Sequence, residues 1–409
     1  MMSTLKPFLR LASRNLMRNR LRTAITLFAI VFGVASLIVS GGFVRDIFYQ
    51  LGEALIHSQS GHVQIGRSAI FGHGSRTPER YLLSDPERIK ARIAADPAVS
   101  DVMARITFTG LLNNGKTDYA IIADGMEPEP ERRLGSHLRI VDGRALNGED
   151  VFGVMLGEGV AQAMRLAPGD RATLLVSTLG GAMNTLDVQV VGVFQTFSKD
   201  FDARAIRLPL KAAQELLLTS GVGKLVVSLN ATADTDTFVA RIRADLPDGV
   251  EALDWRQLND FYEKTVALYE QQFGFLQLMV LLMVCLSVVN TINMSILERS
   301  WEFGTMRAVG SRGVSIASVI LTESTLLGVI GASLGAVLGM SVAGLVSSVG
   351  IPMPPPPNAE IGYDAFIRLV PSVIVQSWAV GLLATLIASI YPAYRTSRLP
   401  IVDALRSRA

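Results

Sequence analysis

Two long apolar segments joined by a short charged one constrain the fold of this chain most strongly. Residues 273–296 carry no charged side chain, and residues 314–349 carry only Glu323. The segment Glu298–Arg312 (ERSWEFGTMRAVGSR), which lies between them, carries five charged side chains. A bilayer core of about 30 Å takes about 20 apolar residues per helix. The pattern is therefore typical of a tight loop between two membrane-spanning helices.

Two further apolar segments bring the predicted number of membrane spans to four. Neither residues 23–44 nor residues 370–391 contain a charged side chain. Residues 314–349 would reach about 54 Å as one helix, so we expect this span to tilt or to project from the bilayer. A cleaved signal peptide is the alternative for residues 23–44. It is disfavoured because the apolar run is long and no A-x-A-like site follows it before Arg45.

The distribution of charge predicts the orientation of these spans. Residues 1–22 carry six Lys and Arg and no acid, with leucines between them, which predicts a basic amphipathic helix on the cytoplasmic leaflet. Residues 297–313 carry three basic and two acidic side chains, and residues 392–409 carry four Arg and one Asp. Residues 45–272 carry 24 basic and 30 acidic side chains. Because Lys and Arg in short segments favour the cytoplasm, both termini are predicted to be cytoplasmic.

Residues 45–256 are predicted to form a mixed α/β domain on the outer side of the membrane. With more than 200 residues the domain is long enough to bury its own core. The single cysteine, Cys285, excludes an intrachain disulfide and a cysteine-based metal site. The predicted fold class is thus a membrane α-helical protein with four transmembrane helices, plus an extracytoplasmic mixed α/β domain inserted between the first and second spans.

Alternating and 3.6-residue patterns predict the elements of this domain. The expected strands are His62–Ile65, Val102–Leu112, Tyr119–Ala123, Val154–Leu156, Ala172–Val176, Val188–Phe194 and Leu225–Leu229. The expected helices are Pro86–Ala95, Glu158–Leu166, Leu210–Leu218 and Thr235–Asp245.

An amphipathic helix is predicted over residues 257–272. Its apolar positions recur at intervals of three and four and continue without a break into residues 273–296. We expect a stalk that stands out of the membrane and needs a partner for its apolar stripe, either the domain of this chain or a second copy. The stalk residues are Leu258, Phe261, Tyr262, Thr265, Leu268 and Tyr269.

The third span carries two features that predict contacts between helices. Gly331, Gly335 and Gly339 lie four residues apart, and such small residues let helices approach closely, although glycine is also simply common in membrane helices. Glu323 is an acid within a span, where an unpaired carboxylate is costly, so we expect a polar partner on another helix. A proton relay is disfavoured because no other acid or histidine lies at that depth.

The loop at residues 350–369 contains the segment Ile351–Asn358 (IPMPPPPN). Four consecutive prolines cannot continue a helix and favour an extended polyproline conformation. A rigid spacer is the favoured interpretation, and a tip that touches the large domain or a cargo is the alternative.

No motif in the chain predicts catalysis. Gly110–Thr117 fits the P-loop pattern G-x-x-x-x-G-K-T, but it lies between two predicted strands and its Asn-Asn-Gly is typical of a hairpin turn. The histidines His57, His62, His73 and His137 lack a metal-binding spacing and are predicted to be loop or surface residues. The chain is therefore predicted to be no enzyme, with no cofactor, no metal and no nucleic-acid partner.

The charged loop carries a motif of a known family. Over 13 residues it is similar to E-R-x-x-E-[FI]-G-x-[ML]-R-A-[VI]-G, the coupling helix of the FtsX/MacB/LolC-E superfamily of ABC transporter permeases. The matching positions, which are the candidate ATPase-coupling residues, are Glu298, Arg299, Glu302, Phe303, Gly304, Met306, Arg307, Ala308 and Gly310. We expect a short amphipathic helix along the membrane, with Trp301, Met306 and Val309 on its apolar side.

Two other segments resemble the same family. Residues 154–175 (VMLGEGVAQAMRLAPGDRATLL) are similar to a strand–helix–turn element of the MacB-type periplasmic core. The end of the chain resembles the terminal pattern of these permeases at Pro392, Ala393, Arg395, Arg398, Pro400, Ala404, Leu405 and Arg406.

The resemblance implies the permease half of an ABC complex of the lipoprotein-releasing type, without a fused ATPase domain. Two copies of a cytoplasmic P-loop ATPase would bind ATP and Mg²⁺, and a second permease copy or paralogue would complete the membrane part. The implied mechanism is mechanotransmission, in which ATPase closure pushes the coupling helix and the stalk moves the outer domain.

The cargo implied by the resemblance stays open between three interpretations. A lipoprotein or other lipidated cargo is favoured by the segment at residues 52–67 and the proline loop, with a periplasmic carrier protein as a candidate partner. MacB-like efflux of amphiphilic small molecules or peptides is second. An FtsX-like scaffold that activates a cell-wall hydrolase is third, because FtsX outer domains are smaller than this one.

Overall fold

The structure, a computed structural model, describes residues 20–72, 78–83, 85–135, 138–196, 198–354 and 362–398. The chain divides into two compact units. The helical unit comprises Met1–Phe48, Val266–Pro352 and Asp364–Ala409, and the α/β unit comprises Tyr49–Thr265 and Met353–Tyr363. The basic segment at residues 1–19 and the terminal segment at residues 399–409 lie outside the described residues.

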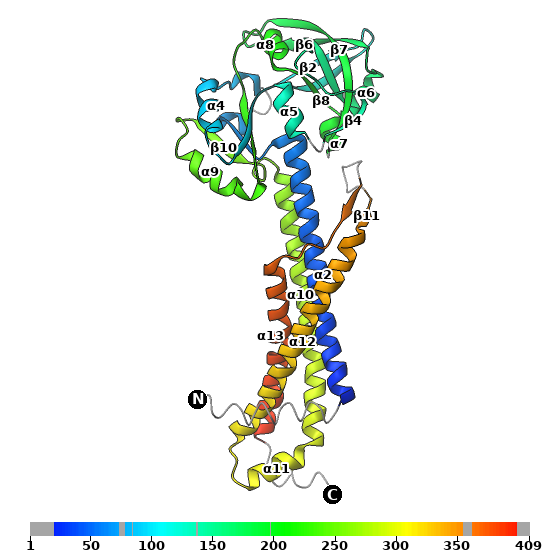
Figure 1. The fold of residues 1–409 in the computed structure, drawn as a ribbon, viewed down its shortest axis with the longest axis vertical. Helices are drawn as coiled ribbons and strands as arrows, with labels where there is room; N and C mark the ends of the chain where they lie inside the picture. Colours follow the sequence, from blue (N-terminus) through cyan, green and yellow to red (C-terminus); the bar gives the residue numbers. More distant parts are fainter. Residues whose placement is uncertain are drawn as a thin grey trace. The chain divides into compact units, whose positions relative to one another are not determined.

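Four long helices build the helical unit (Figure 1). They are α2 (Arg20–Leu55), α10 (Asp260–Glu298), α12 (Gly313–Val349) and α13 (Pro371–Ser397), and the short α11 (Ser300–Ala308) lies between α10 and α12 in the chain. All four long helices are long and apolar enough to cross a membrane. The four predicted spans therefore correspond to four helices, and α12 begins within one residue of the predicted start.

Two of these helices run further than predicted. The helix α2 does not end at Val44 but continues to Leu55 and through a π-helical turn, Ile56–Ser60. It ends at Gly61, where φ is 65° and a Cβ would lie 2.3 Å from Val226 Cγ1, so the turn needs glycine. Similarly, α13 passes Tyr391 and continues through Pro392 to Ser397. The helices run further because the length of an apolar run reflects the thickness of the bilayer. The end of a helix depends instead on the residues that can form a turn.

The predicted stalk is part of one continuous helix with the second span. The helix α10 begins at Asp260, so Tyr262, Thr265, Leu268 and Tyr269 lie on it. Leu258 does not, because it lies in the turn at residues 255–258 that follows β10 (Val250–Asp254). Phe261 also falls within α10.

The glycine stripe of α12 packs against α2, as predicted. A Cβ on Gly331 would lie 2.8 Å from Ile30 Cγ2, and one on Gly339 would lie 3.1 Å from Ala35 Cα. A Cβ on Gly335 would lie 2.8 Å from the backbone oxygen of Val31. Backbone cannot move aside as a flexible side chain can, so the close approach of the two helices depends on these glycines.

Replacing Gly335 by alanine is expected to destabilise the helical unit by about 1–3 kcal/mol, the usual cost of overpacking. The matched control is Gly344→Ala on the same helix, where a Cβ would meet nothing within 4 Å. The control should leave the midpoint of thermal unfolding unchanged or raise it slightly, because alanine favours helix. Equal midpoints for the two variants in detergent would contradict the close packing.

Within its described residues, the α/β unit contains ten strands in one sheet and seven short α-helices. The strands are β1 (Val63–Arg67), β2 (Val99–Asn113), β3 (Asp118–Met126), β4 (Arg139–Gly143), β5 (Gly153–Gly157), β6 (Arg171–Ser177), β7 (Met183–Gln195), β8 (Ala205–Pro209), β9 (Lys224–Leu229) and β10 (Val250–Asp254). The helices are α3 (Ser68–Phe71), α4 (Pro86–Ala94), α5 (Pro128–Leu134), α6 (Glu158–Met164), α7 (Lys199–Asp202), α8 (Leu210–Leu217) and α9 (Thr235–Arg243).

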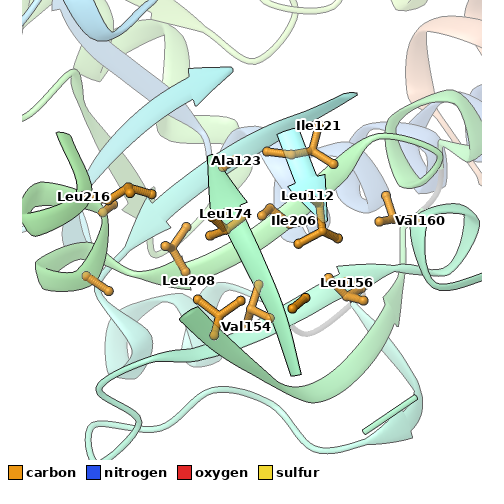
Figure 2. Close-up of a cluster of buried hydrophobic side chains, with 14 of the residues drawn as sticks. Leu112, Ile121, Ala123, Val154, Leu156, Val160, Leu174, Ile206, Leu208 and Leu216 are labelled. Atoms are coloured by element: carbon orange, nitrogen blue, oxygen red, sulfur yellow. The ribbon is translucent and has the colours of Figure 1, made fainter. Parts of the chain in front are cut away.

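Six of the strands form a closed ring. The pairings run β2–β3–β8–β5–β7–β6 and return from β6 to β2. The core inside contains side chains from every strand of the ring, together with α6 and α8, and Figure 2 shows part of it. Its fully buried members include Leu112, Val154, Leu174, Ile206 and Leu208. A second core lies where β1, β9, β10 and the start of β2 pack against α4 and α9.

All seven predicted strands and all four predicted helices of this unit are present. Three strands were missed. The segment of β4 is mostly exposed, β8 contains Arg207 and Pro209, and β10 pairs only with β1 at the edge of the sheet. The P-loop-like segment is a hairpin turn between β2 and β3, as predicted, with Asn113 paired opposite Asp118.

The proline loop has a short strand pair at its base. The strand β11 (Ile351–Met353) pairs with β12 (Tyr363–Ala365), a pairing that the expected polyproline spacer did not include. Residues 355–361 lie outside the described part of the chain.

Candidate functional site

The charged loop is fixed to the third span by one arginine. Arg299, which precedes α11, donates from Nη1 to the two carboxylate oxygens of Glu323 on α12, at 2.9 and 3.1 Å. Its Nε donates to Glu302 Oε2 at 3.1 Å, and its guanidinium lies 5.1 Å from the centre of the Phe303 ring. A single side chain thus joins the loop, α11 and α12.

This ion pair is largely withdrawn from solvent. The side chain of Arg299 is 7% exposed and that of Glu323 is 15% exposed. A buried pair of this kind contributes little net stability compared with apolar residues, but removing one partner leaves an uncompensated charge. The polar partner of Glu323 is therefore a residue of the charged loop, in the turn between α10 and α11.

The side of α11 that packs inward differs from the predicted one. Phe303 and Gly304 are buried, and Met306 packs against the core that α2, α10, α12 and α13 share. Trp301 and Val309, expected on the apolar side, are instead 43% and 89% exposed. The segment forms the predicted short helix, but Phe303 rather than Trp301 packs toward the other helices.

The end of α13 also contacts the loop. Arg307 Nη1 donates to the backbone oxygen of Ser397 at 3.4 Å, and a Cβ on Gly313 would lie 2.5 Å from the same oxygen. The loop is therefore anchored to α12 through Glu323 and to α13 through Ser397.

The nine candidate coupling residues divide between two environments. Arg299, Phe303 and Gly304 are buried, and three others are partly buried: Glu302, Met306 and Arg307. Glu298, Ala308 and Gly310 are exposed. We call the exposed surface of the loop the outer face of α11. It is made of Trp301 and Ala308 of α11 together with the flanking residues Leu297, Glu298, Val309 and Gly310. The family motif marked only part of it, because a motif gives residue types and not the side on which they lie.

The structure describes two histidines of the α/β unit: His62 lies in a loop, as predicted, but is buried, and His57 lies in the π-helical turn and is partly buried. The Nδ1 of His62 accepts from the Leu229 amide, so its Nε2 carries the proton and donates to Thr232 Oγ1 at 3.2 Å. Burial, with a smaller contribution from the nearby His57, lowers the pKa of His62 to about 4. His57 lies 3.2 Å from Glu53. His73 and His137 lie outside the described residues, within which no cluster of His, Cys, Asp or Glu could hold a metal ion.

Comparisons with known proteins account for both units. The family described as MacB-like periplasmic core domain matches residues 23–245, and the family described as FtsX-like permease C-terminal matches residues 274–401. The first match covers more than half of the chain.

Curated relatives agree with these matches. The lipoprotein-releasing system transmembrane protein LolE of Haemophilus influenzae is 24% identical over 78% of this chain and 80% of its own length. The uncharacterized ABC transporter permease MJ1507 of Methanocaldococcus jannaschii is 25% identical over 97% of this chain and 96% of its own. The macrolide export ATP-binding/permease protein MacB of Rhodospirillum rubrum is 25% identical over 97% of this chain and 60% of its own. With four membrane-span helices, an α/β unit of the MacB-like periplasmic class and an FtsX-like C-terminal part, the chain belongs to the FtsX/MacB/LolC-E superfamily of ABC transporter permeases.

Proposed function

We propose that this permease couples ATP hydrolysis by a separate cytoplasmic P-loop ATPase to movement of its periplasmic α/β unit. The observation that carries the proposal is the buried Arg299–Glu323 pair, because it ties the loop that an ATPase would contact to the third span. A push on α11 would then act on α12 directly rather than deform a flexible loop.

The other contacts of the loop support the same mechanism. Phe303 and Met306 pack into the core of the helical unit, and Arg307 reaches the end of α13. The helix α10 has 39 residues, about 58 Å at 1.5 Å per residue, and it leads from the loop to the part of the chain that enters the α/β unit. Mechanotransmission needs such anchored, continuous helices.

The outer face of α11 is the proposed docking surface of the ATPase. Leu297, Trp301 and Val309 are large apolar side chains that this loop leaves exposed, beside the charge of Glu298. Aromatic residues in the centre of an interface often contribute most of the binding energy. The proposed complex has two permease copies, identical or paralogous, and two ATPase subunits, with ATP and Mg²⁺ bound by the ATPases.

The orientation belongs to the same proposal. The excess of Lys and Arg in residues 1–22 and 392–409 favours an inner-membrane protein with both termini in the cytoplasm. The loop around α11 would then face the ATPase, and the α/β unit would lie in the periplasm.

The proposed cargo is a lipoprotein or another lipidated molecule that leaves the outer leaflet of the membrane. Support comes from the relative named as a lipoprotein-releasing system protein, which matches over most of both chains. Efflux of small amphiphiles is the second candidate, supported by the macrolide export relative that matches 97% of this chain.

The double variant Trp301→Ala/Val309→Ser is expected to weaken ATPase binding by about 2 kcal/mol or more, roughly 30-fold in Kd. The measurement is the amount of P-loop ATPase, and its hydrolysis rate, that copurifies with the tagged full chain. Leu345→Ala is the matched control, since Leu345 is an exposed apolar residue of α12 outside the loop. Glu302→Lys is unsuitable as an interface variant, because it would also break the contact with Arg299.

An ATPase that copurifies with the wild type and the control, but not with the double variant, supports the docking surface. If the double variant retained the ATPase in full, the outer face of α11 would not be the docking surface.

A further inference from the structure

The α/β unit contains a pocket of about 340 Å³ that none of the family matches explains. It lies on the face of the sheet opposite the ring core. Ligand pockets in proteins commonly measure about 300–1,000 Å³ and combine an apolar lining with a few polar groups. The pocket has the size and the composition of such a site.

The alternation of β2 builds the polar wall of the pocket. Ile106 and Phe108 point into the core, so Arg105 and Thr107 point to the other face. Lys224 on β9 is paired directly opposite Arg105, and Asp124 on β3 is paired directly opposite Thr107. Residues paired in this way share a face of the sheet, which brings these polar side chains of three strands into one pocket.

Most charges at this wall have partners. Arg105 is bound by both carboxylate oxygens of Glu131 on α5, with Nη2 at 2.7 Å from Oε2. Asp124 accepts a hydrogen bond of 2.6 Å from Thr107 Oγ1. Arg207, paired opposite Asp124 on β8, donates to the Ser58 backbone oxygen at 2.6 Å, and its Nε is buried with no hydrogen-bond partner among the described residues.

Lys224 is the charged residue of the pocket whose side chain has no such partner. No hydrogen bond or ion pair joins its Nζ to another residue in the described part of the chain. The charged residues that line the pocket are Arg105, Lys224 and Asp124, so two cations face one carboxylate, and Glu131 pairs with Arg105 from behind the lining. Burial lowers the pKa of Lys224, with a smaller opposing effect of Asp124, because the ammonium loses water without gaining a close partner.

The rest of the lining combines apolar and polar residues. Ile70 and Phe71 of α3, Ile122 of β3, Phe201 of α7 and Leu258 are apolar, whereas Gln59, Ser60, Gln64 and Asn259 are polar. An ammonium that faces a cavity with aromatic and aliphatic walls suits a ligand with an anionic head and an apolar body. A fully polar anion would leave these apolar side chains against water.

We infer that this pocket binds a small anionic amphiphile, with a carboxylate or phosphate oxygen accepting from Lys224 Nζ and the apolar body against Phe71 and Phe201. The inference goes beyond the proposed function and does not depend on it, because binding to this pocket requires neither an ATPase nor transport. Carboxylate and phosphate heads share the chemistry that Lys224 recognises.

The test is isothermal titration of the full chain in lipid nanodiscs with octanoate and with octyl phosphate, after subtraction of a titration of empty nanodiscs. Octyltrimethylammonium and octanol are the cationic and neutral probes. We expect at least one anion to bind and both other probes to bind about tenfold more weakly or not at all. The stronger of the two anions identifies the headgroup class.

The variant Lys224→Met is expected to weaken binding of that anion by about tenfold or more, whereas Lys224→Arg should retain it. Lys211→Met, at an exposed lysine of α8, is the matched control and should bind as the wild type does. Because the ammonium lacks a partner, Lys224→Met should not lower the midpoint of thermal unfolding.

Three results would overturn the inference: no binding of either anion, binding of the cationic or neutral probe as tightly as the anions, or equal affinity of the wild type and Lys224→Met. If Lys224→Met fails to fold, Lys224→Arg and the comparison of the four probes still decide the question.

Discussion

Replacement of Arg299 by alanine is expected to destabilise the helical unit by about 3–5 kcal/mol, as is typical when one partner of a buried ion pair is removed. The physical reason is that Glu323 would keep its position on α12 with no cation in contact, within a mostly apolar surrounding. Phe303 would also lose the guanidinium over its ring. The measurement is the midpoint of thermal unfolding of the purified chain in detergent.

Two further variants separate the pair from its individual charges. Arg299→Met/Glu323→Leu removes both charges, so we expect a stability near that of the wild type. Arg312→Ala, at an exposed arginine just beyond α11, should change stability by less than about 1 kcal/mol. If Arg299→Ala unfolded at the same temperature as Arg312→Ala, the buried pair would not hold the loop.

The variant that removes both charges also distinguishes stability from coupling. The Arg299→Met/Glu323→Leu chain would be folded but would lack the ionic link between the loop and α12. We expect it to retain a bound ATPase, because the outer face of α11 is unchanged.

The second large effect is expected in the α/β unit, where Glu131→Ala would leave Arg105 buried without its carboxylate. Arg105 is almost fully buried and Glu131 is buried, and the pair makes two parallel hydrogen bonds. The remaining contact of Arg105, from Nη1 to the Gln59 oxygen at 2.5 Å, cannot neutralise its charge. We expect a loss of about 3–5 kcal/mol in the free energy of unfolding.

The matched control for this prediction lies on the same helix. Glu129 pairs with Arg132 at 3.0 Å, and both side chains are about half exposed. Glu129→Ala should therefore cost less than about 1 kcal/mol. Thermal unfolding of the two variants gives the comparison, and a loss in Glu129→Ala as large as that in Glu131→Ala would contradict the role assigned to burial.

The sequence was most informative about elements that a long, uninterrupted pattern of residues identifies. Four uncharged runs predicted four helices, and the glycines of α12 predicted its close contact with another helix. The ends of the helices were not predictable in the same way. Arg45 and Asp46 end the apolar run of the first span, but neither residue breaks a helix as proline does, and α2 continues past both.

The sequence was less informative about sites that depend on which side chains meet. Glu323 predicted that some polar partner exists, but Arg299 was assigned to an ATPase contact because the motif that contains it lies in the loop. The pocket around Lys224 was missed altogether. Lys224 and Arg105 are more than 100 residues apart in the chain, and only the register of β2 with β9 brings them together. The sequence did contain one indication of the pocket. Arg105 and Thr107 lie at alternate positions of a predicted strand, which places two polar side chains on the same face of the sheet.

The central claim, that an ATPase docks on the outer face of α11, is tested most directly by photo-crosslinking in living cells. A benzophenone amino acid replaces Trp301 in one full-length chain and Leu345 in another, both of which are exposed. We expect the position of Trp301 to crosslink to a P-loop ATPase, identified by mass spectrometry of the crosslinked peptide, and the position of Leu345 not to do so. Absence of any ATPase crosslink at Trp301, or an equal crosslink at Leu345, would contradict the claim.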